Sequence, residues 1–115
     1  MSLKAANAAS SDTSQFICND WETTDNFIST KGTRFIGKKI NEGFVIKNRY
    51  KDKIELRYLG NWNNDAVKLY SGTNLKWQTT EVYGVAKSNA NISGYDWKFV
   101  HFGFHHNAHT ECIDE

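Results

Sequence analysis

Proline is absent from this chain of 115 residues, and methionine and cysteine are scarce, with one and two residues. Without proline, the turns depend on glycine, asparagine, aspartate and serine. No run of apolar residues approaches the roughly 20 that a transmembrane helix requires. No segment shows the apolar spacing of an amphipathic helix. These absences disfavour both a helical domain and a membrane-spanning helix.

Catalytic motifs are missing as well. The chain has no GxSxG turn, no HExxH metal motif and no glycine-rich phosphate loop. Pairs of His101 or His106 with Glu81 or Glu111 suit acid–base cleavage of RNA, but nothing in the sequence brings them together. We therefore expect a protein that is not an enzyme. A small histidine-dependent, nuclease-like hydrolase is the alternative.

Aromatic residues, by contrast, make up 14% of the chain, which is too many for a disordered protein. Short alternating segments recur every 8–12 residues or so between turn-forming residues, as in small antiparallel β domains. We predict an all-β fold, a single-domain antiparallel β-sandwich or small barrel of about seven or eight strands. The domain is expected to cover residues 16–115, behind a disordered tail at residues 1–15.

The segment from Tyr95 to Cys112 carries bulky side chains on both faces of an extended strand, which favours a central position in the sheet. Its even positions place apolar side chains on one face, and we assign that face to the core. Residues 54–59 alternate apolar and charged side chains, so their apolar face joins the core. The predicted core residues are Val100, Phe102, Phe104, Ile54, Leu56, Tyr58, Phe44 and Ile46.

The two cysteines, Cys18 and Cys112, stand near the two ends of the predicted domain. We expect them to form a disulfide, as in secreted proteins, with two reduced thiols in a cytosolic protein as the alternative. In the chain-entropy model such a bond stabilises the fold by about 4–5 kcal/mol. The small-x-small spacing of residues 6–8 resembles a signal-peptide cleavage site. We therefore expect a mature secreted, extracellular domain, with a merely flexible polar tail as the alternative.

Positive charge is concentrated between Lys31 and Arg57, where nine basic residues outnumber three acidic ones. Residues 33–40 and 44–50 are predicted to form a hairpin whose turn uses Gly43 at a positive φ. A basic hairpin of this kind is able to attract a nucleic acid, an acidic glycan or membrane headgroups.

Two considerations weaken the attraction to nucleic acid. Lys47 and Arg49 are expected to face the strand that carries Glu55, where cross-strand ion pairs would neutralise them. Lysines also protect the exposed edges of sheets from aggregation. We therefore do not expect a nucleic-acid partner.

Trp62 stands inside residues 60–65, a polar segment that is predicted to be a turn. An indole beside asparagine side chains suits a sugar, because the ring stacks on the pyranose while the amides bond its hydroxyls. An exposed tryptophan equally suits a protein interface. Trp77 and Trp97 are assigned to the core.

The leading hypothesis is a secreted, non-catalytic recognition module that binds a protein or a carbohydrate through loop aromatics and a basic hairpin surface. A secreted enzyme inhibitor is a further alternative. Small β domains whose terminal strands are joined by one disulfide occur among secreted inhibitors, effectors and lectin-like modules, which is an analogy of fold alone. The predicted binding residues are Trp62, Asn61, Asn63, Lys47, Arg49, Lys38 and Lys39.

All four histidines fall between residues 101 and 109. Imidazole is a ligand for zinc, copper and nickel, so a site for a divalent transition metal is a secondary hypothesis. A solvated strand end is the alternative, and our first expectation is a protein without a cofactor. The candidate metal ligands are His105, His106, His109 and Glu111.

Overall fold

The computed structural model describes residues 14–23, 35–47, 51–88, 94–103 and 107–114. Arg49, Phe104, His105 and His106 lie outside these ranges, as does most of the predicted tail at residues 1–15. The expectations stated for them stay predictions.

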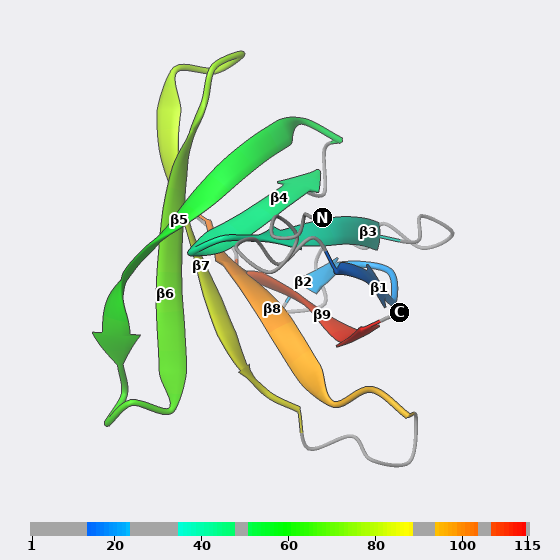
Figure 1. The fold of residues 1–115 in the computed structure, drawn as a ribbon. Helices are drawn as coiled ribbons and strands as arrows, with labels where there is room; N and C mark the ends of the chain where they lie inside the picture. The colour runs from blue at the N-terminus through cyan, green and yellow to red at the C-terminus, as the bar shows by residue number, and fades with distance from the viewer. Residues whose placement is uncertain (1–13, 24–34, 48–50, 89–93, 104–106, 115) are drawn as a thin grey trace, which may run out of the picture.

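All regular structure within the described ranges is β-strand, which confirms the predicted fold class. The nine strands are β1 (Gln15–Cys18), β2 (Glu22–Thr23), β3 (Phe35–Ile40), β4 (Gly43–Lys47), β5 (Lys53–Trp62), β6 (Val67–Asn74), β7 (Thr79–Lys87), β8 (Trp97–Phe102) and β9 (Ala108–Asp114). Eight of them form a closed antiparallel barrel in the order β1-β3-β4-β5-β6-β7-β8-β9, because β9 pairs back onto β1. The short β2 pairs with the first residues of β9. The fold is therefore a single small barrel (Figure 1).

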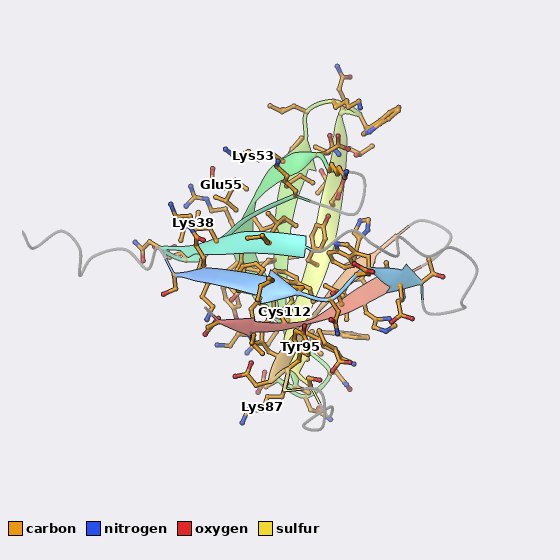
Figure 2. All side chains as sticks on the ribbon, turned by 90° about the vertical axis from the view of Figure 1, so that its right-hand side faces the viewer. Lys38, Lys53, Glu55, Lys87, Tyr95 and Cys112 are labelled. Atoms are coloured by element: carbon orange, nitrogen blue, oxygen red, sulfur yellow. A yellow bond between two sulfur atoms is a disulfide. The ribbon has the colours of Figure 1, made fainter. Side chains whose placement is uncertain are left out.

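The barrel closes by pairing its first strand with its last. Cys18 lies opposite Cys112 in the register of β1 and β9, and the two sulfur atoms form a disulfide. Figure 2 shows Cys112 beside this seam. Both cysteines are fully buried, so the bond lies inside the barrel. The predicted disulfide is present, and its position shows that it joins the two strands that complete the sheet.

The interior is filled mainly by aromatic rings. Phe44 meets Phe99 edge-on at 5.0 Å between ring centroids, and Phe16 meets Trp97 edge-on at 4.9 Å. Such edge-to-face pairs are stabilising beyond the area that they bury. The buried apolar residues are Phe16, Cys18, Trp21, Phe44, Ile46, Ile54, Leu56, Tyr83, Phe99, Ala108 and Cys112. Four predicted core residues, Phe44, Ile46, Ile54 and Leu56, are therefore confirmed.

The prediction of which face of the strand β8 points into the core is wrong. Phe99 and His101 point into the barrel and are buried, whereas Val100 and Phe102 lie on the outer face and are half-buried. The reason is the pairing with β9, in which Trp97 lies opposite the inward-facing Cys112. Because side chains alternate along a strand, this register turns every odd position of β8 inward.

Two other aromatic residues were also misplaced. Tyr58 continues the inward face of β5, but it lies at the mouth of the barrel and keeps 51% of its surface exposed. Trp77 lies in the turn after β6 and is 62% exposed rather than buried. Trp97 does pack against the core, as predicted.

The turns differ from the prediction in position and in their positive-φ residues. The turn between β3 and β4 places Glu42, not Gly43, at φ 68°. Gly43 begins β4 instead, where a Cβ atom would lie 1.9 Å from the carbonyl oxygen of Leu56, so only glycine fits. Residues 71–74 belong to β6, and the β6–β7 turn follows at residues 75–78.

Among the described residues, the pairing of the strands β5, β6, β7 and β8 is irregular at one point. Gly84 in β7 pairs regularly with Leu69 and Val100. The bulge lies in β5, where the pairing with β6 shifts between Tyr58 and Gly60. The strand β5 then runs on to Trp62, so Trp62 ends a strand and does not stand in a turn.

Successive hairpin connections alternate between two ends of the barrel. The turns at residues 41–42 and 63–66 lie at the first end, and residues 51–52 and the turn at 75–78 lie at the second. Figure 1 shows the β6–β7 turn at the top and the β5–β6 turn at the lower left. The two ends carry different chemistry.

Candidate functional site

A groove of ≈ 690 Å³ opens at the first end, between the β3–β4 turn and the strands β5 and β6. Its walls combine three aromatic residues, two asparagines, two lysines and the residues of the β3–β4 turn. The lining residues are Lys39, Ile40, Asn41, Glu42, Gly43, Phe44, Tyr58, Asn61, Lys68 and Tyr70.

The bulge in β5 brings Tyr58 and Asn61 onto the same wall. Residues three apart on a regular strand face opposite sides, because side chains alternate. The register shift at Gly60 restores both to the inner face, so that Tyr58 lies opposite Tyr70 and Asn61 lies opposite Lys68. The Tyr58 hydroxyl then donates a hydrogen bond of 2.6 Å to Oδ1 of Asn61. The amide of Asn61 in turn donates to Oδ1 of Asp65 at 3.1 Å. These bonds fix the orientation of the amide.

Aromatic rings form the floor of the groove. Phe44 meets Tyr70 edge-on at 4.9 Å between ring centroids, and Tyr70 meets Tyr58 edge-on at 5.7 Å. Burial raises the pKa of the Tyr70 phenol above its ordinary value, and the neighbouring Tyr58 adds to the shift. Tyr70 therefore stays a neutral hydroxyl, able to donate and accept hydrogen bonds, well into the alkaline range.

Two lysines flank the groove in different electrostatic states. Lys39 donates a hydrogen bond of 2.8 Å to Asp114 and lies 5.5 Å from the ring of Trp97, so its charge is partly balanced. Lys68 is exposed and forms no ion pair with any residue that the structure describes. The groove therefore offers one unneutralised ammonium beside its aromatic floor.

The predicted binding residues are divided among several surfaces. Asn61 and Lys39 line the groove. Trp62 is 56% exposed, but it points to the outer face, where its ring meets Phe102 edge-on at 5.9 Å. Asn63 is exposed in the β5–β6 turn. Lys38 and Lys47 are exposed on the outer faces of β3 and β4, and Arg49 lies outside the described residues.

Sequence reasoning missed Tyr58, Tyr70 and Lys68 as groove residues. Tyr58 was assigned to the core because it continues the alternation of β5, which is correct for its face. The alternation does not show that this inward face becomes exposed to solvent at the mouth of the barrel. Lys68 and Tyr70 are two residues apart on β6 and therefore share a face. This spacing was a sequence signal that could have grouped them.

Of the candidate metal ligands, only two lie in the described ranges. His109 and Glu111 alternate with the buried Ala108, Thr110 and Cys112, so both face outward on β9. The Glu111 carboxylate accepts a hydrogen bond from the Ser88 hydroxyl. Within the part of the chain that the structure describes, no three His, Cys, Asp or Glu residues are grouped to hold a metal ion. The metal hypothesis, which depends on His105 and His106, stays a prediction.

A second polar site lies inside the barrel near the second end. Nε2 of His101 lies 3.4 Å from Oε1 of Glu81, and its ring stacks on Tyr83 at 4.6 Å between centroids. The same Oε1 atom accepts a hydrogen bond of 2.6 Å from the Tyr83 hydroxyl. The other oxygen, Oε2, accepts one of 2.9 Å from the amide of Asn74. Both carboxylate oxygens are therefore engaged within the network, which ties β6, β7 and β8 together.

The chain matches no protein-family model, no curated protein and no solved structure. Among the described residues no helix has the length and apolar character needed to cross a membrane. The fold and the groove define a class only in structural terms, an eight-stranded antiparallel barrel closed by a disulfide and open to solvent at one end. Its function has to be inferred from its surfaces.

Proposed function

We propose that the protein is a secreted, non-catalytic binding protein that holds a saccharide unit of a glycan in the groove at the first end of the barrel. The observation that carries the proposal is that Asn61 and Lys68 lie in one groove with the rings of Tyr58 and Tyr70. The disulfide between Cys18 and Cys112 is compatible with an extracellular protein and supports this setting.

The interior of the barrel argues for a site at the mouth. Barrels of about eight strands are either filled by side chains or hold one small ligand. Here the rings of Phe16, Phe44 and Phe99 contact one another across the interior and fill it. The groove of ≈ 690 Å³ lies within the size range of small-molecule sites. A single sugar ring with its neighbours in a chain fits this combination of size and openness.

The chemistry of the walls matches the chemistry of a sugar. Tyrosine rings offer apolar area to the C–H face of a pyranose, and their hydroxyls bond its oxygens. The amide of Asn61 both donates and accepts, and it is held in place by Tyr58 and Asp65. Lys68 adds a donor that favours hydroxyl-rich or carboxylated sugars. A fixed array of such groups binds with little loss of side-chain freedom.

A glycan array followed by titration calorimetry with the best ligand tests the proposal. Replacing Lys68 by Ala, or Asn61 by Ala, is expected to weaken binding about tenfold, as the loss of one or two good hydrogen bonds does. The matched control for the lysine is Lys87→Ala, which removes an exposed lysine of β7 that does not line the groove. An array without ligands, or equal losses in the Lys68 and Lys87 variants, contradicts the proposal.

One contact favours a second candidate function. His101 and Glu81, which were considered as an acid–base pair for RNA cleavage, do lie side by side at 3.4 Å. However, both side chains are about nine-tenths buried, and neither lines the groove. Incubation with RNA tests this alternative. Cleavage that is lost in the His101→Gln variant but kept in the Lys68→Ala variant would favour the hydrolase.

A further inference from the structure

Three lysines and one arginine share the outer surface of the strands β3, β4 and β5. Side chains at alternate positions of paired strands lie on one face, and the pairing places Lys38 and Glu55 on either side of Val45, with Lys47 opposite Lys53. We call Lys38, Lys47, Lys53, Arg57 and Glu55 the outer basic face. All five are exposed. Figure 2 shows Lys38, Glu55 and Lys53 together on this side of the barrel.

The pairing of β4 with β5 removes the first structural explanation for these lysines. Glu55 was expected to neutralise Lys47 across the strands, but its direct partner on β4 is Val45. The Glu55 carboxylate pairs instead with Arg57, two residues along its own strand. No ion pair is formed by Lys38, Lys47 or Lys53 with any residue in the described ranges.

The closed barrel removes the second explanation for Lys38. Lysines protect a sheet where an edge strand exposes unpaired backbone groups. Lys38 lies where β3 pairs with both β1 and β4, so it does not stand on such an edge. Lys47 and Lys53 pair with each other, but they lie beyond the residues that pair with β3 and β6. Moreover, like charges directly opposite each other on neighbouring strands are destabilising. The Lys47–Lys53 pair is therefore expected to destabilise the sheet, and no ion pair in the described ranges offsets this repulsion.

We propose that the outer basic face binds a sulfated or carboxylated polysaccharide. Lysine ammonium groups act as strongly hydrated point charges, which suits a polymer with many charges and no fixed planar geometry. The apolar residues beside these charged side chains, Ile36 and Val45 among them, are aliphatic. The exposed Trp62 lies beyond the bulge at the far end of β5, so in the described ranges no aromatic platform for stacking nucleic-acid bases stands among the basic residues. A barrel with a buried disulfide is compatible with an extracellular setting, where the abundant anionic polymers are such glycans.

This surface is separate from the groove. The groove lies on the inner face at the mouth of the barrel, and the outer basic face lies on the other side of the same strands. Binding at one surface is therefore measurable without the other. Lys47 and Lys53 do not line the groove, so a loss of affinity caused by replacing them reports on the outer basic face alone.

Heparin serves as the probe, in a titration at several salt concentrations with the full chain. In the double variant K47Q/K53Q, affinity at low salt is expected to fall about tenfold to thirtyfold. The slope of log affinity against log salt is expected to fall by about one to two, because two contacts are lost. The matched control is K87Q/K98Q, which removes two lysines of β7 and β8, Lys87 being visible far from this face in Figure 2. It is expected to change affinity less than about twofold.

A second variant is expected to bind heparin more tightly, a result that a folding defect would not produce. Glu55→Gln removes the acidic group of this face and releases Arg57 from its ion pair. Affinity for heparin is expected to rise by a few-fold. Equal losses in K47Q/K53Q and in the control, or no gain in Glu55→Gln, would overturn the proposal. The proposal would also be overturned if RNA or duplex DNA displaced bound heparin as effectively as free heparin of the same total charge.

Discussion

Glu81 and His101 face each other inside the barrel, with 3.4 Å between Oε1 and Nε2 and side chains that are about one-tenth exposed. The carboxylate also accepts hydrogen bonds from Tyr83 and Asn74. Asn74 extends the network to Asp52 at 3.1 Å, just before β5. A buried carboxylate that accepts several hydrogen bonds fixes the positions of its donors. If the carboxylate is removed, each donor is left without a partner. The network is therefore expected to hold the second end of the barrel in shape.

Replacing Glu81 by Ala should lower the free energy of unfolding by about 2–4 kcal/mol, because several donors are left without an acceptor in a buried site. Glu81→Gln keeps an oxygen that still accepts from Tyr83 and should cost about half as much. Urea denaturation measures both. Glu22→Ala, at an exposed position of β2, is the control and should stay within about 0.5 kcal/mol of the unchanged protein. Similar values for all three variants would show that the network contributes little to stability.

Removing the disulfide should destabilise the barrel strongly. The bond between Cys18 and Cys112 closes a loop with a sequence separation of 94. In the chain-entropy model a loop of this length is worth about 4–5 kcal/mol. The Cys18→Ala/Cys112→Ala double variant should therefore unfold at much lower urea. Mass analysis after alkylation without reductant should find no free thiol in the native protein. Two alkylated cysteines in that sample would contradict both the bond and the extracellular setting.

The orientation of β8 predicts different losses of stability when Phe99 and Phe102 are replaced. Phe99→Ala should cost about 3–5 kcal/mol, because the ring is fully buried among Phe16, Phe44 and Tyr83. Phe102→Ala should cost about 1–2 kcal/mol, since its ring is half-buried on the outer face and loses mainly its contact with Trp62. Thermal or urea unfolding separates the two. A larger loss at Phe102 than at Phe99 would mean that the register of β8 is shifted by one residue.

Tyr70 predicts a specific alkaline behaviour. Its pKa is raised in the folded protein by burial and by Tyr58, while in the unfolded chain it returns to about 10. Because the folded state retains the proton longer, its contribution to stability is complete below pH 10 or so and is lost as the pH rises through the folded pKa. A spectrophotometric titration near 295 nm should include a late step from Tyr70. Tyr70→Phe should remove that late step and weaken the alkaline loss of stability, and a curve unchanged by the substitution would disprove the assignment.

Local alternation was enough to predict part of this structure. The periods of β4 and β5 correctly placed Phe44, Ile46, Ile54 and Leu56 in the core, because apolar residues at every second position have one way to leave water. The disulfide was also predicted, from two cysteines near the ends of the domain. In the groove, the sequence pointed to Asn61 and Lys39. It did not indicate that Tyr58, Tyr70 and Lys68 join them.

The sequence by itself therefore determined that the fold consists of β-strands and which face points inward in strands with a single apolar side. It also determined the two cysteines that form the disulfide. The tertiary structure decided which face of β8 points inward, since both faces are bulky and only the pairing of Trp97 with Cys112 distinguishes them. It also decided that the bulge before Gly60 returns Asn61 to the groove, and that Lys47 meets Lys53 instead of Glu55. The reason is physical. Alternation is a property of one strand, whereas register and bulges are set by hydrogen bonds to the neighbouring strand, and a shift of one residue turns every side chain to the other face.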